Sequence, residues 1–171
     1  VANGFWQHAR SNAEHNLKAL GQWRDAGLPV VTGCPSCALM FRVDLPEYFP
    51  DLAEKYGACR LADAQEFLLD AVDSGDLSVK ADGKPTNLPD LKLIYHAPCH
   101  LRAQGNGLPG LELLRRLDGV TVENADAGCC GISGSYGFKK EKYDIAQTVG
   151  SELFDKVRES GAHAAVSECG T

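Results

Sequence analysis

The sequence lacks three features that would place the protein in a membrane or on nucleic acid. No apolar run approaches the roughly 18 residues that a membrane-spanning helix needs, and no signal-peptide pattern opens the chain. A basic excess is also missing, because 17 Lys and Arg residues stand against 23 Asp and Glu residues and leave a net charge of −6. Non-specific binding to nucleic acid needs a positively charged surface. We therefore expect no transmembrane segment and no nucleic-acid partner, but an acidic protein that docks on other proteins.

Cysteine, by contrast, is plentiful, with seven among the 171 residues. An odd number would leave one thiol unpaired in a disulfide-bonded secreted protein, and the missing signal sequence favours a reducing compartment. Clustered cysteines in such a compartment usually serve metal binding or redox chemistry. With 44% apolar residues, the chain has enough material for the core of one ordinary domain, or of one domain with a fragment of another.

Two adjacent cysteines, Cys129 and Cys130, stand between Gly128 and Gly131. Adjacent cysteines rarely pair with each other, because disulfide geometry is demanding. The flanking glycines allow the backbone to approach a bulky group closely. Thiolates are the ligands that hold iron–sulfur clusters or zinc. This run therefore predicts part of a metal site.

Strand-like and helix-like segments alternate along the chain. The expected helices cover residues 7–26, 63–73, 111–117 and 139–160, and the expected strands cover residues 29–32, 91–97, 120–122 and 164–167. Asp63 should cap the second helix, whose buried face includes Phe67 and Leu68. The order of elements predicts a layered α/β fold with a largely parallel sheet. Sites in such sheets gather at the carboxyl ends of the strands, which is where the cysteine loops fall.

The segments between these elements carry residues that form turns or break helices. We expect a surface linker at residues 74–90 and a loop at residues 101–109, both containing glycine and polar side chains. The helix that precedes Pro46 and Pro50 should be short, because both prolines interrupt helical backbone.

A second pair of thiols lies in the run Cys34-Pro35-Ser36-Cys37, directly after the first expected strand. Two cysteines at this spacing can serve a metal site. They can also form a thioredoxin-like dithiol, in which a helix N-terminus stabilises one thiolate. Both interpretations stay open. Cys59 lies outside any motif and is expected to be structural.

An internal repeat relates the two ends of the chain. Residues 31–36 align with residues 166–171 at an offset that takes Cys34 to Cys169, and each segment follows an amphipathic helix and a strand. The same offset would place a counterpart of the adjacent cysteine pair just before the first residue. We therefore expect the tail of a first repeat at residues 1–58, a helix and linker at 59–90, and a second repeat at 91–171 that stops before its last cysteine.

Cys99, the Cys129-Cys130-Gly131 run and Cys169 follow one another in an order that resembles the cysteine-rich CCG domain, which occurs in tandem pairs. Three stretches add to the resemblance: TGCPSCALMF at 32–41, YHAPCH at 95–100 and SYGFKKE at 135–141. Such pairs are found in heterodisulfide reductases and in iron–sulfur subunits of glycolate, lactate and anaerobic glycerol-3-phosphate oxidation systems. The chain is most similar to the last group.

The resemblance implies a 4Fe–4S cluster in an opened, non-cubane form. The implied ligands are Cys99, Cys129, Cys130 and Cys169, while Cys34 and Cys37 would serve the equivalent site of the first repeat. Zinc is the alternative metal, because four thiolates suit its tetrahedral preference. The family's full motif ends in CxxC, of which only Cys169 is present, and ferredoxin-like cysteine runs are missing. An empty site in this fragment is therefore one expected outcome.

Two histidines, His96 and His100, flank Cys99. As groups around the metal site, they could orient a thiolate, tune a cluster through hydrogen bonds or ligate a metal. The other interpretation is that each simply makes a structural hydrogen bond.

The function implied by the resemblance is electron transfer within a respiratory dehydrogenase. The subunit would relay electrons from a flavin-containing partner toward membrane quinone, on the cytoplasmic side and peripheral to the inner membrane through its partners. Glycerol 3-phosphate, lactate or glycolate would be oxidised on the partner. Two alternatives remain open: a zinc-stabilised docking module without a redox role, and a thiol–disulfide enzyme that uses Cys34 and Cys37.

Overall fold

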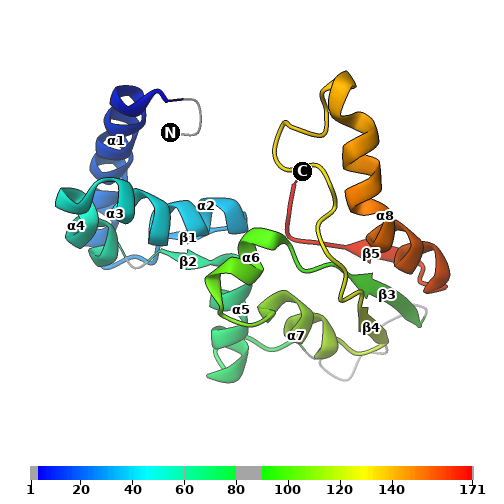
Figure 1. Ribbon diagram of the computed structural model, residues 1–171. Coiled ribbons are helices and arrows are strands. Elements are labelled where there is room, and N and C mark those ends of the chain that lie inside the picture. The colour runs from blue at the N-terminus through cyan, green and yellow to red at the C-terminus, as the bar shows by residue number, and fades with distance from the viewer. Residues whose placement is uncertain (1–3, 60, 80–89, 171) are drawn as a thin grey trace. The chain divides into compact units, whose positions relative to one another are not determined.

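The computed structural model describes residues 4–59, 61–79 and 90–170. The chain forms two compact units, residues 1–67 and residues 68–171 (Figure 1). Most of the linker expected at residues 74–90 lies outside the described residues. The expected division of the chain into repeats stays a prediction.

The first unit combines a pair of short parallel strands with several helices. Its elements are α1 (Trp6–Asp25), β1 (Val31–Thr32), α2 (Pro35–Leu39), the π-helical turn η1 (Met40–Asp44), α3 (Leu45–Tyr48), the 3₁₀ turn η2 (Pro50–Leu52), α4 (Ala53–Ala58) and β2 (Ala62–Asp63). Strand β1 pairs in parallel with β2. The core contains Ala13 and Leu17 of α1, packed with Leu45, Phe49 and Tyr56. The predicted amphipathic helix and the strand that precedes the CxxC run are confirmed.

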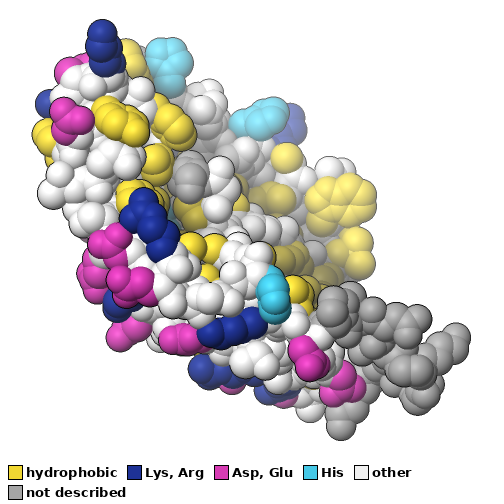
Figure 2. Space-filling view, turned by 90° about the vertical axis from the view of Figure 1, so that its right-hand side faces the viewer, with side chains coloured by type: hydrophobic (Ala, Val, Ile, Leu, Met, Phe, Trp, Pro, Cys, Tyr) yellow, Lys and Arg dark blue, Asp and Glu magenta, His cyan; other side chains and the backbone are white. Residues whose placement is uncertain are grey.

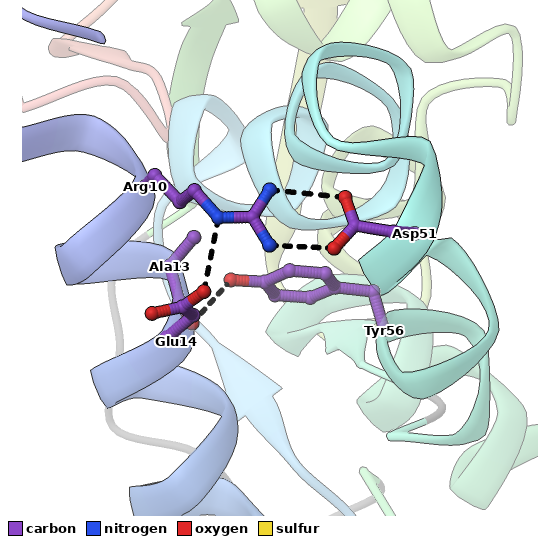
Figure 3. A network of polar contacts seen from close by, with 5 residues as sticks. All are labelled: Arg10, Ala13, Glu14, Asp51 and Tyr56. Carbon is purple, nitrogen blue, oxygen red and sulfur yellow. Dashed lines mark hydrogen bonds and ion pairs between the residues drawn. The ribbon is translucent and has the colours of Figure 1, made fainter. Parts of the chain in front are cut away.

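Polar contacts join α1 to the later helices of this unit (Figure 3). The Arg10 guanidinium donates two hydrogen bonds to the Asp51 carboxylate and a third, at 3.0 Å, to Glu14. Tyr56 donates its hydroxyl hydrogen to the carbonyl oxygen of Ala13 at 2.8 Å. Burial raises the pKa of Tyr56 to about 12, so this hydroxyl keeps its proton near neutral pH.

The expected helix break at Pro46 is wrong. Helical backbone continues from Pro35 through Tyr48 and ends just before Pro50. Because proline has no N–H, it cannot bond to the carbonyl four residues earlier in an α-helix. The π-helical turn just before Pro46 widens the backbone, and the N–H of Leu45 bonds to Met40, five residues back.

Helix α5 (Ala64–Asp73) is the second predicted helix, but its expected buried face is wrong. Phe67 and Leu68 are 40% and 42% exposed. The cap is confirmed in part, because Asp63 accepts a hydrogen bond from the backbone N–H of Gln65 at 2.9 Å. The carboxylate of Glu66 accepts a hydrogen bond from the Arg42 guanidinium at 3.0 Å.

The second unit is built around three parallel strands. The strands are β3 (Leu91–Tyr95), β4 (Val120–Asn124) and β5 (Ala164–Val166), and the helical elements are α6 (Cys99–Gln104), α7 (Pro109–Arg115), η3 (Lys140–Lys142) and α8 (Tyr143–Glu159). Strand β3 lies between β4 and β5 and is parallel to both. The predicted parallel α/β architecture is confirmed.

Helices cover both faces of this sheet (Figure 1). Successive residues of a strand point to opposite faces, and the neighbours Ile94 and Tyr95 lie in different core clusters. Ile94 packs with Leu153 of α8, whereas Tyr95 packs with Leu111 of α7. The unit is therefore a three-layer sandwich of helix, sheet and helix.

Part of the loop expected at residues 101–109 is helical. Helix α6 begins at Cys99 and ends at Gln104, and the next residue, Gly105, forms a left-handed cap with a φ of +71°. Leu101 is 1% exposed and anchors this short helix. Tertiary packing, which the local sequence does not reveal, overrides the polar composition of the segment.

No helix in the described ranges combines the length and the apolar character needed to cross a membrane. Figure 2 shows acidic and basic side chains mixed with hydrophobic ones over the face that it presents.

Candidate metal centre

The ends of the three parallel strands in the second unit stand in one row. Tyr95, the last residue of β3, pairs with Asn124 at the end of β4 and with Val166 at the end of β5. All of the cysteines expected to bind a metal in this unit follow within six residues of this row. Because parallel strands share one carboxyl edge, the three cysteine loops leave the sheet on the same side.

The loop that carries Cys129 and Cys130 packs closely on α8. Gly131 has a φ of +86°, and a Cβ on it would lie 2.0 Å from the carbonyl oxygen of Ala146. Gly150 of α8 leaves room for a second close contact, since a Cβ added at this position would lie only 2.6 Å from the carbonyl oxygen of Cys130. Only glycine fits either place without movement of the backbone. The two glycines therefore fix the cysteine pair against the helix.

The start of α6 is linked to this loop. Cys99 is the first residue of α6 and is exposed. Three residues later, Arg102 donates a hydrogen bond to the carbonyl oxygen of Ala127 at 3.3 Å. The helix that presents Cys99 and the loop that presents Cys129 and Cys130 are thus joined directly.

Cys34 and Cys169 have the same local backbone contact in the two units. The N–H of Cys34 bonds to the hydroxyl of Thr32 at 3.3 Å, and the N–H of Cys169 bonds to the hydroxyl of Ser167 at 3.4 Å. Both cysteines follow the end of a parallel strand. This equivalence agrees with the alignment expected from the sequence repeat.

The thiols of Cys34 and Cys37 contact each other at the start of α2. The Cys34 sulfur accepts hydrogen bonds from the backbone N–H groups of Cys37 and Ser36 and from the Cys37 thiol, and these bonds lower the pKa of Cys34. Burial, and then the neighbouring Cys34, raise the pKa of Cys37. Of the two thiols, Cys34 therefore ionises more readily than Cys37.

The two histidines near Cys99 differ in their surroundings. His96 is half-buried, and its backbone N–H bonds to Val166 at 2.9 Å. Burial, with a smaller contribution from Arg102, lowers the pKa of His96, so its ring is neutral at pH 7. Within the described part of the chain, its buried Nδ1 has no hydrogen-bond partner. His100 is exposed.

The donor chemistry of the site suits a thiolate-bound metal group. All seven cysteines are free thiols, and those at the strand ends are exposed or half-buried, whereas Cys59 is buried in the core of the first unit. The unpaired Nδ1 of His96 could also bond to an added group. Among the described residues, however, no three His, Cys, Asp or Glu side chains are grouped closely enough to hold a metal ion. The structure therefore brings the loops to one edge without closing the thiols around a common centre.

The sequence patterns did not single out three residues that shape these sites. Gly150 carried a detectable signal, because a glycine inside a long helix often marks a close backbone approach. Tyr95 and Glu168, which bond to each other beside Cys169, carried none, since their contact joins residues far apart in the chain.

Residues 93–171 match the cysteine-rich domain family CCG. The match agrees with the resemblance expected from the cysteine order.

Curated relatives extend the similarity to the whole chain. The chain is 35% identical over 175 residues to a subunit of the anaerobic glycerol-3-phosphate dehydrogenase from Escherichia coli K12, an alignment that covers 100% of the chain and 42% of that relative. It is 32% identical over 143 residues to a subunit of the fumarate reductase (CoM/CoB) from Methanothermobacter marburgensis, covering 82% of the chain and 26% of that relative. The chain thus spans less than half the length of these relatives. No solved structure matches it.

Proposed function

We propose that the chain is part of an iron–sulfur subunit of an oxidoreductase. The observation that carries the proposal is the row of strand ends at Tyr95, Asn124 and Val166, which sends three cysteine loops off one edge of a parallel sheet. The match to the CCG domain and the similarity to subunits of a dehydrogenase and a reductase support it.

The proposed ligands in the second unit are Cys99, Cys129, Cys130 and Cys169, and the proposed group is a 4Fe–4S cluster. Bound there, such a cluster would accept and release single electrons. The chain itself contributes thiolates, a backbone N–H of Gly131 that lies 3.4 Å from the Cys129 sulfur, and the neutral ring of His96. Hydrogen bonds to cluster sulfurs tune the reduction potential. We propose that Cys34 and Cys37 serve the equivalent site of a first repeat.

In the complete protein, we propose that this subunit receives electrons from a flavin-containing dehydrogenase partner and passes them toward membrane quinone. The name of the E. coli relative makes glycerol 3-phosphate the first donor to test. Oxidation of the donor would take place on the partner. The subunit would lie on the cytoplasmic side, attached to the inner membrane through its partners.

The metal content of the complete protein tests this proposal. The protein is reconstituted anaerobically with iron and sulfide, its iron and zinc are measured, and its EPR spectrum is recorded before and after reduction. Bound iron with a redox-dependent EPR signal is the expected result. Zinc without iron would contradict the proposal and favour a docking module without redox function.

A second candidate function is favoured by the contact between Cys34 and Cys37. A thiolate on Cys34 could attack a small-molecule disulfide, releasing one thiolate and forming a mixed disulfide. Cys37 would then lose its proton to solvent and displace the second thiolate, leaving a Cys34–Cys37 disulfide and the reduced small molecule. A thiol–disulfide titration with a glutathione buffer tests this function, and Cys37→Ser should accumulate the mixed disulfide. Failure of Cys34 to react faster than Cys37 near neutral pH would contradict it.

A further inference from the structure

Tyr95 occupies a central place at the edge where the cysteine loops begin. It is the last residue of the middle strand, pairs with β4 on one side and β5 on the other, and is 1% exposed. Its ring packs with Ala97 and Leu111 in the core between the sheet and α7. Such a side chain has little freedom, so any group bound to its hydroxyl is held at a fixed position.

The hydroxyl of Tyr95 bonds to the carboxylate of Glu168. The oxygen–oxygen distances are 2.7 Å and 2.8 Å to the two carboxylate oxygens, and the single hydroxyl hydrogen is donated to one of them at a time. Hydrogen bonds to an ionised acceptor are stronger than those between neutral groups. Glu168 immediately precedes Cys169 and belongs to the segment that follows β5.

The bond therefore ties the segment that carries Cys169 to the rigid middle of the sheet. The other cysteine loops are held by different means: Gly131 and Gly150 seat one loop on α8, and Arg102 links it to α6. Ser167 shapes the local turn at Cys169, but that contact spans only two residues. The contact with Tyr95 joins residues that are 73 positions apart.

We infer that Tyr95 and Glu168 act as positioning residues that hold Cys169 at the candidate metal centre. This inference rests on the proposed function for the role of Cys169 as a ligand. The ordering of the Cys169 segment is a property of the chain itself and can be measured without metal. A Phe at position 95 keeps the packed ring and removes only the hydroxyl.

The test compares Tyr95→Phe with Tyr56→Phe in the complete protein. Tyr56 is also a buried tyrosine that donates to an acceptor far along the chain, but its partner is the carbonyl of Ala13 in the other unit. In metal-free protein, the rate at which iodoacetamide alkylates Cys169 is followed by mass spectrometry, with Cys99 as an internal reference. We expect a rise of about tenfold for Tyr95→Phe and none for Tyr56→Phe. Glu168→Ala should reproduce the effect, and Glu168→Gln, which keeps an acceptor oxygen, should partly restore the slow rate.

A second measurement uses protein reconstituted with iron. Tyr95→Phe should alter the EPR spectrum or reduction potential of bound iron, and Tyr56→Phe should leave both unchanged. Absence of iron from the wild type would overturn the proposed function, and with it the ligand role of Cys169. Equal alkylation rates of Cys169 in the wild type and Tyr95→Phe would overturn the positioning role itself, and so would an equal rise in Tyr56→Phe.

Discussion

The packing of the cysteine loop on α8 predicts a large difference between two glycines in similar backbone. Gly131 and Gly134 have φ values of +86° and +63°, but only at Gly131 would a Cβ meet another atom, the Ala146 oxygen at 2.0 Å. An alanine in left-handed backbone costs about 1–2 kcal/mol at either position. The overlap at position 131 forces the loop and helix apart, which costs about 1–3 kcal/mol more.

We therefore expect Gly131→Ala to lower the free energy of unfolding by about 3 kcal/mol and Gly134→Ala by about 1 kcal/mol. The assay is urea unfolding followed by two signals. The only two tryptophans, Trp6 and Trp23, belong to the first unit, so their fluorescence reports that unit alone, while far-UV circular dichroism reports helices of both. Gly131→Ala should shift the circular dichroism transition and leave the fluorescence transition in place.

Equal losses for the two variants would refute the close approach of the loop to α8. A matching shift in tryptophan fluorescence would also count against the reasoning, because it would show that the substitution disturbs the first unit.

Two further predictions concern single residues in the two units. Gly150→Ala should destabilise the second unit by about 1–3 kcal/mol, because its Cβ would lie 2.6 Å from the Cys130 carbonyl oxygen. Gly21→Ala in α1 should instead stabilise the first unit by up to about 1 kcal/mol, because the nearest atom to its Cβ would be 3.6 Å away. The same urea assay measures both, and stability changes of the same sign for the two variants would contradict this prediction. Asp63→Asn should gain stability over the wild type as pH rises. Burial raises the pKa of Asp63 above the unfolded value of about 3.9, so the wild type loses stability as pH rises from that value through the folded pKa. Asp51→Asn should lose stability relative to the wild type as pH rises. Its hydrogen bond to Arg10 lowers the pKa of Asp51, so the ionised Asp51 stabilises the wild type at higher pH, and this stabilisation is lost as pH falls. Fluorescence-detected unfolding between about pH 2 and pH 7 checks both variants, with Asp51→Asn tested below about pH 4 and Asp63→Asn above it. A pH-independent difference for Asp63→Asn would contradict the burial argument.

Much of the second unit could be predicted, because the pattern within each strand and the order of strands and helices along the chain favour the same fold. The apolar strand that ends at Tyr95 and the short strand at Val120 are punctuated by glycine and proline, and both lead into cysteine loops. A parallel sheet then follows from the alternation with helices, and the carboxyl edge is the expected place for a site.

The errors arise where contacts distant in the chain decide the local structure. Periodicity correctly predicted helix α5, but it indicates an apolar stripe without showing what covers it, and Phe67 and Leu68 stay exposed. Helix α6 begins at Cys99 because buried Leu101 anchors a segment whose composition is that of a loop. The bond between Tyr95 and Glu168 depends on the pairing of β3 with β5, which local patterns do not show.

The central claim is that the cysteines at the carboxyl edge of the second unit hold a cluster. The most direct test is the EPR spectrum of the complete, reconstituted protein with Cys130→Ser, compared with Cys59→Ala. Cys59 lies buried in the core of the first unit and serves as the matched cysteine outside the site. The claim predicts that Cys130→Ser loses or changes the signal of one cluster, while Cys59→Ala keeps the wild-type spectrum. A Cys130→Ser protein with the wild-type spectrum and iron content would contradict it.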